Sequence, residues 1–148
     1  MADEPAAAAA APTGAAGAVC RSHACAACCY DTEMPISEED AGRLQALGHV
    51  RDAFSQVDAD GILTLRNVPH ADGSGRSHCY FLKNELCSVY AQRPAGCRIY
   101  PFVLDATARR VVRDVDCPWR REFPHDASAG RRLMVAWTAI TRETARRR

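Results

Sequence analysis

The stretch CRSHACAACC, residues 20–29, places four cysteines within ten positions, and the last two, Cys28 and Cys29, are adjacent. Alanine fills other positions of the same stretch, such as Ala24 and Ala26, so a need for small apolar side chains does not explain the thiols. Free cysteine normally contributes one or two small buried side chains to a core. This concentration indicates that the thiols together bind a ligand.

The remaining cysteines follow at wider intervals, and all eight lie between residues 20 and 117. The Cys25-x2-Cys28 spacing is typical of tetrahedral zinc sites and of iron–sulfur sites, because a short turn aims two sulfurs at one centre. We therefore predict a metal or cluster site. The candidate ligands are Cys20, Cys25, Cys28, Cys29, Cys79, Cys87, Cys97 and Cys117.

The adjacent pair Cys28 and Cys29 limits how the thiols can be grouped. Neighbouring Cα atoms are about 3.8 Å apart, and in extended chain their side chains point to opposite sides. Two such sulfurs do not easily occupy two corners of one tetrahedron. Eight thiols with such a pair indicate either two four-sulfur sites or one cluster with a reactive cysteine beside it.

The first 19 residues are rich in alanine and interrupted by proline and glycine, and we expect them to form a disordered leader. They carry Asp3 and Glu4 where a secretory signal would be basic, and they contain no run of bulky apolar residues. No stretch of about 18 apolar residues predicts a membrane span. We therefore expect a cytoplasmic protein, whose reduced thiols are available for metal rather than for disulfides.

The net charge is +1, which offers no strong field to attract nucleic acid or a membrane surface. The arginines of the C-terminal RETARRR suit the negative end of a helix, so a nucleic-acid partner is not expected. The sequence shows no phosphate loop, Ser–His–Asp signature or dinucleotide fingerprint. A catalytic cysteine with His125 as base stays open, since nothing in the sequence places the two together, but these observations favour a role other than catalysis.

The pattern predicts one α+β domain over residues 20–148. Ser37, with Asp40 three residues later, predicts the start of a helix, and Gly48 is where its apolar periodicity breaks or kinks. An amphipathic helix is expected from about residue 128, with Leu133, Trp137, Ile140 and Thr144 on one face. Strands are expected at 61–68, 79–83, 99–104 and 110–115, the last two joined by a turn at 105–109.

Charged and imidazole side chains near the cysteines are secondary candidates. Four thiolates around Zn²⁺ or a [4Fe–4S]²⁺ core leave a net charge of −2, which nearby guanidinium groups could stabilise. His23 and His78 each stand next to or near a cysteine and could replace a thiolate, but eight cysteines make this unnecessary. The guanidinium candidates are Arg21, Arg76, Arg93 and Arg98.

The segment CYFLKNELCSVYAQRPAGCRIYPF, residues 79–102, and the late Cys117-Pro118 resemble the YkgJ-type cysteine-cluster family, a zinc- or iron-chelating CxxCxxCC domain. The resemblance covers residues 20–119 and is most specific at Arg93-Pro94, Cys97-Arg98 and Tyr100-Pro101-Phe102. The first cysteine of the family pattern would fall at position 22, which here is Ser22, while Cys20 lies two residues earlier. The resemblance implies a metal domain, and since the family includes a domain similar to part of a flagellin lysine N-methylase, an accessory role in a modification enzyme also stays open.

The arginine–proline segment also has a direct physical interpretation. Pro94 ends the preceding turn, Gly96 permits a close approach before Cys97, and Pro101 favours an extended course. Tyr100 and Phe102 either cover the metal site or pack in the core.

We therefore expect a small metal-stabilised α+β domain with short strands, a hairpin and flanking helices. Its expected cofactor is an iron–sulfur cluster, serving electron transfer, redox sensing or a role on a protein partner. The alternative is zinc, in a structural module for protein interaction, because both metals favour sulfur ligands.

Overall fold

The computed structural model describes residues 15–105 and 107–148, and side chains from residue 19 onward. Most of the predicted leader, residues 1–14, lies outside the described part. Helix α1, Ala15–Ser22, begins within the last residues assigned to that leader and carries Cys20 in its final turn.

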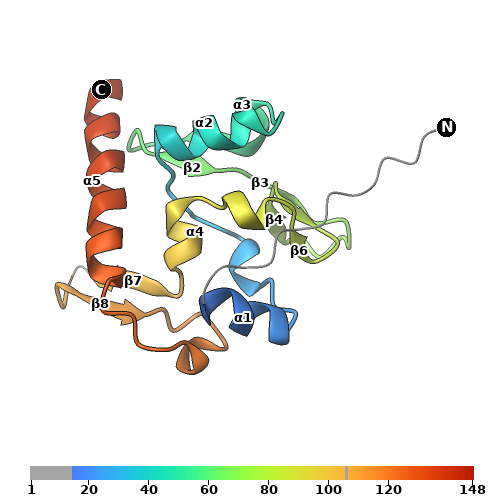
Figure 1. Cartoon of the computed structure of the whole chain (residues 1–148). Coiled ribbons are helices and arrows are strands. Elements are labelled where there is room, and N and C mark those ends of the chain that lie inside the picture. Colours follow the sequence, from blue (N-terminus) through green and yellow to red (C-terminus); the bar gives the residue numbers. More distant parts are fainter. Residues whose placement is uncertain (1–14, 106) are drawn as a thin grey trace.

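The architecture is α+β, as predicted: short helices and short antiparallel strand pairs follow one another along the chain, and a long helix ends it (Figure 1). The helices after α1 are α2 Glu38–Ala46, α3 Arg51–Phe54, α4 Ala95–Ile99 and α5 Ala129–Arg147, with 3₁₀ turns at Ala27–Cys29, Tyr90–Gln92 and Arg120–Glu122. The strands are β1 Ser55–Val57, β2 Leu63–Leu65, β3 Asn67–Pro69, β4 Ser77–Cys79, β5 Leu82–Lys83, β6 Leu86–Cys87, β7 Phe102–Asp105 and β8 Arg110–Arg113.

Helix α2 begins as the sequence predicts. The Ser37 hydroxyl accepts a hydrogen bond from the Asp40 amide at 3.1 Å, and the Asp40 carboxylate accepts one from the Ser37 amide at 3.3 Å. The helix ends before Gly48, which adopts φ +97°, a conformation that glycine reaches without strain. The predicted break therefore separates α2 from the short α3.

The strands form four separate two-stranded antiparallel ribbons, β1–β2, β3–β4, β5–β6 and β7–β8, within the described part of the chain. The strand expected at 61–68 is divided between two of them, because the Arg66 amide turns to donate to the Phe54 carbonyl. Strands of two to four residues in isolated pairs are not stable on their own in water. Something besides the β-ladders must hold these ribbons in place.

The prediction of a strand at 99–104 is wrong for its first residues. Ile99 is the buried last residue of α4, and the strand β7 begins only at Phe102. Pro94 leads into this helix, which closes with bonds from the Arg98 amide to the Pro94 carbonyl and from the Tyr100 amide to the Gly96 carbonyl. The alternation of apolar residues around Ile99 therefore reflects one buried helical turn, whereas the hairpin β7–β8 forms as predicted.

Helix α5 runs along one side of the molecule, beside β7, β8 and α4 (Figure 1). Its predicted apolar face is used in two ways. Ile140 and Thr144 are buried, while Leu133 and Trp137 line a cleft described below. At its C-terminal end, Arg147 pairs with Glu38 of α2.

The hydrophobic core lies between α2, the β1–β2 ribbon and the segment that follows β4. None of the described helices has the length and apolar character needed to cross a membrane. The buried members of the core are Ile36, Ala41, Leu44, Phe54, Leu63, Leu65, Cys79, Phe81 and Val89.

Candidate metal centre

Four of the eight predicted cysteines surround one small cavity of about 20 Å³, which Tyr100 and Trp119 also line. They come from three parts of the sequence: the end of α1, the loop that follows it, and the segment after β8. We call them the first cysteine set. Its members are Cys20, Cys25, Cys28 and Cys117.

Two local contacts bring the first set together. The Cys25 amide donates to the Cys20 carbonyl at 3.0 Å, so the chain curls back after α1. The His23 ring stacks flat on Trp119, with ring centroids 3.6 Å apart, and its Nε2 lies 2.6 Å from a carboxylate oxygen of Glu122. His23 thus joins α1 to the segment of Cys117 instead of standing in for a thiolate.

The other four cysteines pack in or against the hydrophobic core. Cys79 is buried at the end of β4, Cys87 pairs with Leu82 across the β5–β6 ribbon, and Cys97 lies in α4. We call these three and their neighbour Cys29 the second cysteine set.

The loop that carries Cys29 is tied directly to β4. Tyr30 forms a β-bridge with His78, and the Asp31 amide donates to the Ser77 carbonyl at 2.9 Å. The Asp31 carboxylate in turn accepts from the amide and hydroxyl of Ser77. These bonds bring residue 29 to the strand that ends at Cys79.

Burial raises the pKa of most of these thiols, because a desolvated thiolate is costly. The pKa of Cys20 rises to about 11, with further contributions from Cys28 and Cys25. The pKa of Cys79 also rises to about 11, and burial raises the pKa values of Cys97 and Cys117. Such thiols become thiolates readily only when a cation compensates their charge.

The adjacent pair is divided between the two sets. Cys28 lines the small cavity, whereas Cys29 packs against the core with Cys79 and Cys87. The Cys29 thiol donates a hydrogen bond to Cys28, which lowers the pKa of the Cys28 thiol to about 7 and raises that of Cys29. Cys28 is the exposed member of the pair and lies at the border between the sets.

Of the four candidate arginines, Arg93 is the one whose charge reaches both sets. It acts to lower the pKa of Cys20 and Cys28 in the first set, and of Cys87 and Cys97 in the second. Its guanidinium group is held over the Tyr90 ring, 3.8 Å from the centroid, and donates to the Tyr90 carbonyl.

The other three candidate arginines lie over an aromatic ring or donate to a backbone carbonyl. Arg21 also lies over Tyr90, Arg76 lies over Tyr30, and the exposed Arg98 donates to the Ala91 carbonyl.

The remaining residues singled out from the sequence lie in different environments. Tyr100 lines the small cavity, as expected for a covering residue, but Phe102 lines only a larger cleft. His78 directs Nδ1 to the Cys79 carbonyl at 2.9 Å, and His125 is exposed. The Trp119 contact with His23 was not predicted, because it joins residues far apart in the sequence and no local pattern signals it.

The donor set is that of a sulfur-rich metal site, although the thiols are grouped more loosely than in a closed site. Among residues 15–105 and 107–148, no three His, Cys, Asp or Glu side chains are arranged so that they could hold a metal ion. The four thiols that share one cavity, and the four gathered at the core, nevertheless fit a metal that prefers sulfur. Binding would require these side chains to move closer together.

Comparisons with known proteins agree with this chemistry. Residues 19–118 match the CxxCxxCC family, whose description is "Putative zinc- or iron-chelating domain". A comparison with curated proteins found no match, and neither did one with solved structures. The match covers more than half of the chain and all eight cysteines. The chain therefore belongs to the CxxCxxCC family of zinc- or iron-chelating domains, and it is a metal-binding protein.

Proposed function

We propose that the eight cysteines hold metal at two four-thiolate centres, one for each cysteine set. Cys28 would belong to the first centre and Cys29 to the second. The observation that carries this proposal is the division of the adjacent pair: one thiol lines the small cavity, and the other packs against the core. The Cys28 and Cys29 thiols are hydrogen-bonded to each other, so two centres built on this pair would lie side by side, each taking one of the two thiols.

We propose further that the metal is iron in iron–sulfur clusters, and that the protein works in electron transfer or redox sensing with a protein partner. Such clusters supply one-electron exchange at potentials that charge and solvent exposure tune. Two centres joined by neighbouring residues would be close enough for electrons to pass between them. Arg93 would offset the negative charge of both, and Tyr100 would shield the first from water.

The size of the first cavity favours a second candidate. A volume of about 20 Å³ is close to that of one water-sized probe, of order 10–15 Å³, and so suits a single ion better than a cluster core. Two zinc ions, each bound by four thiolates, would then crosslink the ribbons and present a stable surface to a partner. In that case the role is structural.

Anaerobic purification with metal and sulfide analysis separates these candidates. Iron–sulfur clusters predict bound iron, acid-labile sulfide and a broad absorbance near roughly 400 nm that bleaches on reduction. A colourless protein with stoichiometric zinc and no sulfide would replace the iron proposal with the zinc one. Protein that purifies folded without either metal, and takes up neither, would remove both.

A further inference from the structure

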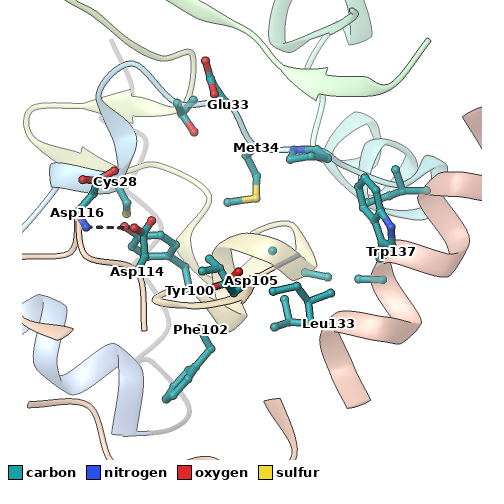
Figure 2. A pocket seen from close by; sticks show the side chains of 18 of the residues that line it. Cys28, Glu33, Met34, Tyr100, Phe102, Asp105, Asp114, Asp116, Leu133 and Trp137 are labelled. Atoms are coloured by element: carbon teal, nitrogen blue, oxygen red, sulfur yellow. Dashed lines mark hydrogen bonds between the residues drawn. The ribbon is translucent and has the colours of Figure 1, made fainter. Parts of the chain in front are cut away.

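A second, much larger cavity of about 980 Å³ lies beside the first cysteine set. Its walls come from the 27–35 segment, α4, β7, the segment after β8, and the N-terminal half of α5 (Figure 2). Cys28 and Tyr100 line both cavities. The large cavity therefore opens to solvent on one side and reaches the exposed thiol of the adjacent pair on the other.

One end of this cleft is acidic. Figure 2 shows Asp114 and Asp116 next to Cys28, with Glu33 on the facing segment. Within the described chain these three carboxylates form no ion pair, and Arg109 is the single basic residue that lines the cleft.

Asp114 is also held in place by its neighbours. Its carboxylate accepts a hydrogen bond from the Asp116 amide at 3.1 Å, and its own amide donates to the Pro101 carbonyl at 2.7 Å. A cluster of carboxylates without ion-pair partners in a partly enclosed cleft attracts a cation.

The opposite end of the cleft is mostly apolar, and the Asp105 carboxylate near it is occupied by the Thr107 and Ala108 amides. Met34 reaches in from the 27–35 segment, and Leu133 and Trp137 face it from α5 (Figure 2). Trp137 keeps 41% of its surface exposed, and its neighbour Met134 keeps 51%. A large aromatic ring left half-exposed on a cavity wall is typical of a binding surface.

From this polarity we infer that the cleft binds a small organic cation, with an ammonium or guanidinium group on an apolar body. The charged group would lie at the acidic end beside Cys28, and the apolar body would lie against Trp137. The volume, about 980 Å³, is within the range of small-molecule sites, roughly 300–1,000 Å³, which favours a free small molecule over a protein segment. The inference does not depend on which metal the cysteines hold.

Three probes of one size and different charge test it on the full, metal-loaded chain. Phenethylammonium, neutral 2-phenylethanol and anionic 3-phenylpropanoate are titrated by calorimetry and by tryptophan fluorescence. We expect the cation to bind about tenfold more tightly than the alcohol, more weakly at higher salt, and the anion not to bind. Equal affinity for all three, or no binding of the cation, would overturn the inference.

Matched variants locate the site. Glu33→Gln and Asp116→Asn should each weaken binding of phenethylammonium by about fivefold, while Asp60→Asn, which removes the same charge outside the cleft, should not. Trp137→Ala should weaken the binding of phenethylammonium and of 2-phenylethanol to the same extent. Metal content and circular dichroism must match the unaltered protein in every variant. An unchanged affinity in both Glu33→Gln and Asp116→Asn would place the cation elsewhere and reject the cleft.

Discussion

Arg93 is a basic side chain that acts on thiols of both cysteine sets. Its guanidinium group is fixed against Tyr90, and its charge reaches thiols of both sets. A group of this kind stabilises thiolates without binding the metal itself. A substitution of Arg93 therefore tests how the protein stabilises the negative charge of its thiolates.

Replacing Arg93 with Gln should speed the loss of metal to a chelator by roughly tenfold, because it removes a positive charge that favours the thiolate form in both sets. Arg98→Gln is the matched control, since Arg98 is exposed and bonds only the Ala91 carbonyl. Metal release is followed with a coloured chelator. Equal release rates in the two variants would show that Arg93 does not support the thiolates.

Gly96 illustrates how closely α4 approaches the 27–35 segment. A Cβ at this position would overlap the sulfur of Met34, whereas a Cβ at Gly42, inside α2, would meet nothing within 4 Å. Gly42→Ala should therefore stabilise the protein by about 0.5–1 kcal/mol through helix propensity. The Gly96→Ala variant should have a free energy of unfolding about 1 kcal/mol lower than that of Gly42→Ala, because the new Cβ displaces Met34.

Urea denaturation of both variants measures the difference, and Met34→Ala in the Gly96→Ala background provides the control. Removing the methionine side chain should restore part of the gain from alanine. If Gly96→Ala stabilises as much as Gly42→Ala, the close packing between these segments is wrong.

At the scale of elements, Asp40 does more than cap α2. Its buried carboxylate accepts from the Ser37 amide, from Arg43 at 2.7 Å, and from the Ala95 amide of α4 at 3.3 Å. Ser37→Ala should cost about 1 kcal/mol, the usual value of a helix cap. Asp40→Ala should cost more, about 2–4 kcal/mol, because it also leaves buried donors without a partner.

Chemical denaturation at neutral pH compares these two variants. The larger loss in Asp40→Ala would show that the carboxylate joins two helices. Equal losses would reduce its role to that of a cap.

The contact between α2 and α5 depends on pH. Hydrogen bonds from Arg51, and then from Arg147, lower the pKa of Glu38 to about 2 from its ordinary value of 4.5. A lowered pKa means that the stabilisation is fully present above about pH 4.5 and is lost as the pH falls toward 2. Because Glu38 is partly exposed and screened by solvent, we expect at most about 1 kcal/mol.

Glu38→Gln should therefore be less stable than the unaltered protein at pH 7, and the difference should shrink at pH 3. Urea midpoints at the two values measure it. A difference that stays constant between them would mean that the ion pairs contribute nothing.

Several elements could be predicted because their signals are local. The capping box at Ser37, the break at Gly48 and the amphipathic pattern of α5 each depend on nearby residues. Ile99 could not be placed, because a short apolar run fits a strand and a single buried helical turn equally well. The strand at 61–68 was divided by a contact with Phe54, which is not visible in its own pattern.

The candidate site was predictable in its chemistry and only partly in its arrangement. The eight cysteines could be recognised as candidate ligands from the sequence alone. The adjacent pair indicated either two four-sulfur sites or one cluster with a spare thiol. Which thiols gather depends on contacts between distant residues, such as the stacking of His23 on Trp119. The sequence did not predict the cleft, because residues that line it, such as Glu33 and Asp116, come from separate segments of the chain.

At the scale of the whole molecule, the described strands form no common sheet, and two of the ribbons, β3–β4 and β5–β6, carry Cys79 and Cys87 of the second cysteine set. Isolated two-stranded ribbons of this length need support from other elements, and a metal bound by their cysteines would add to the support that the core gives. Metal removal should therefore lower the melting temperature and speed amide exchange in residues 77–105, more than in α2 and α5, which are joined by their own ion pairs. Hydrogen exchange with and without chelator checks this, and uniform change across the chain would contradict it.

The most direct test of the two-centre account is the metal content of Cys117→Ala, Cys97→Ala and the double variant, each shown by circular dichroism to be folded. Each single variant should keep about half of the metal of the unaltered protein, and the double variant should keep none. A folded single variant that loses all of its metal would show one shared centre. Full metal content in both single variants would contradict the division of the thiols into two sets.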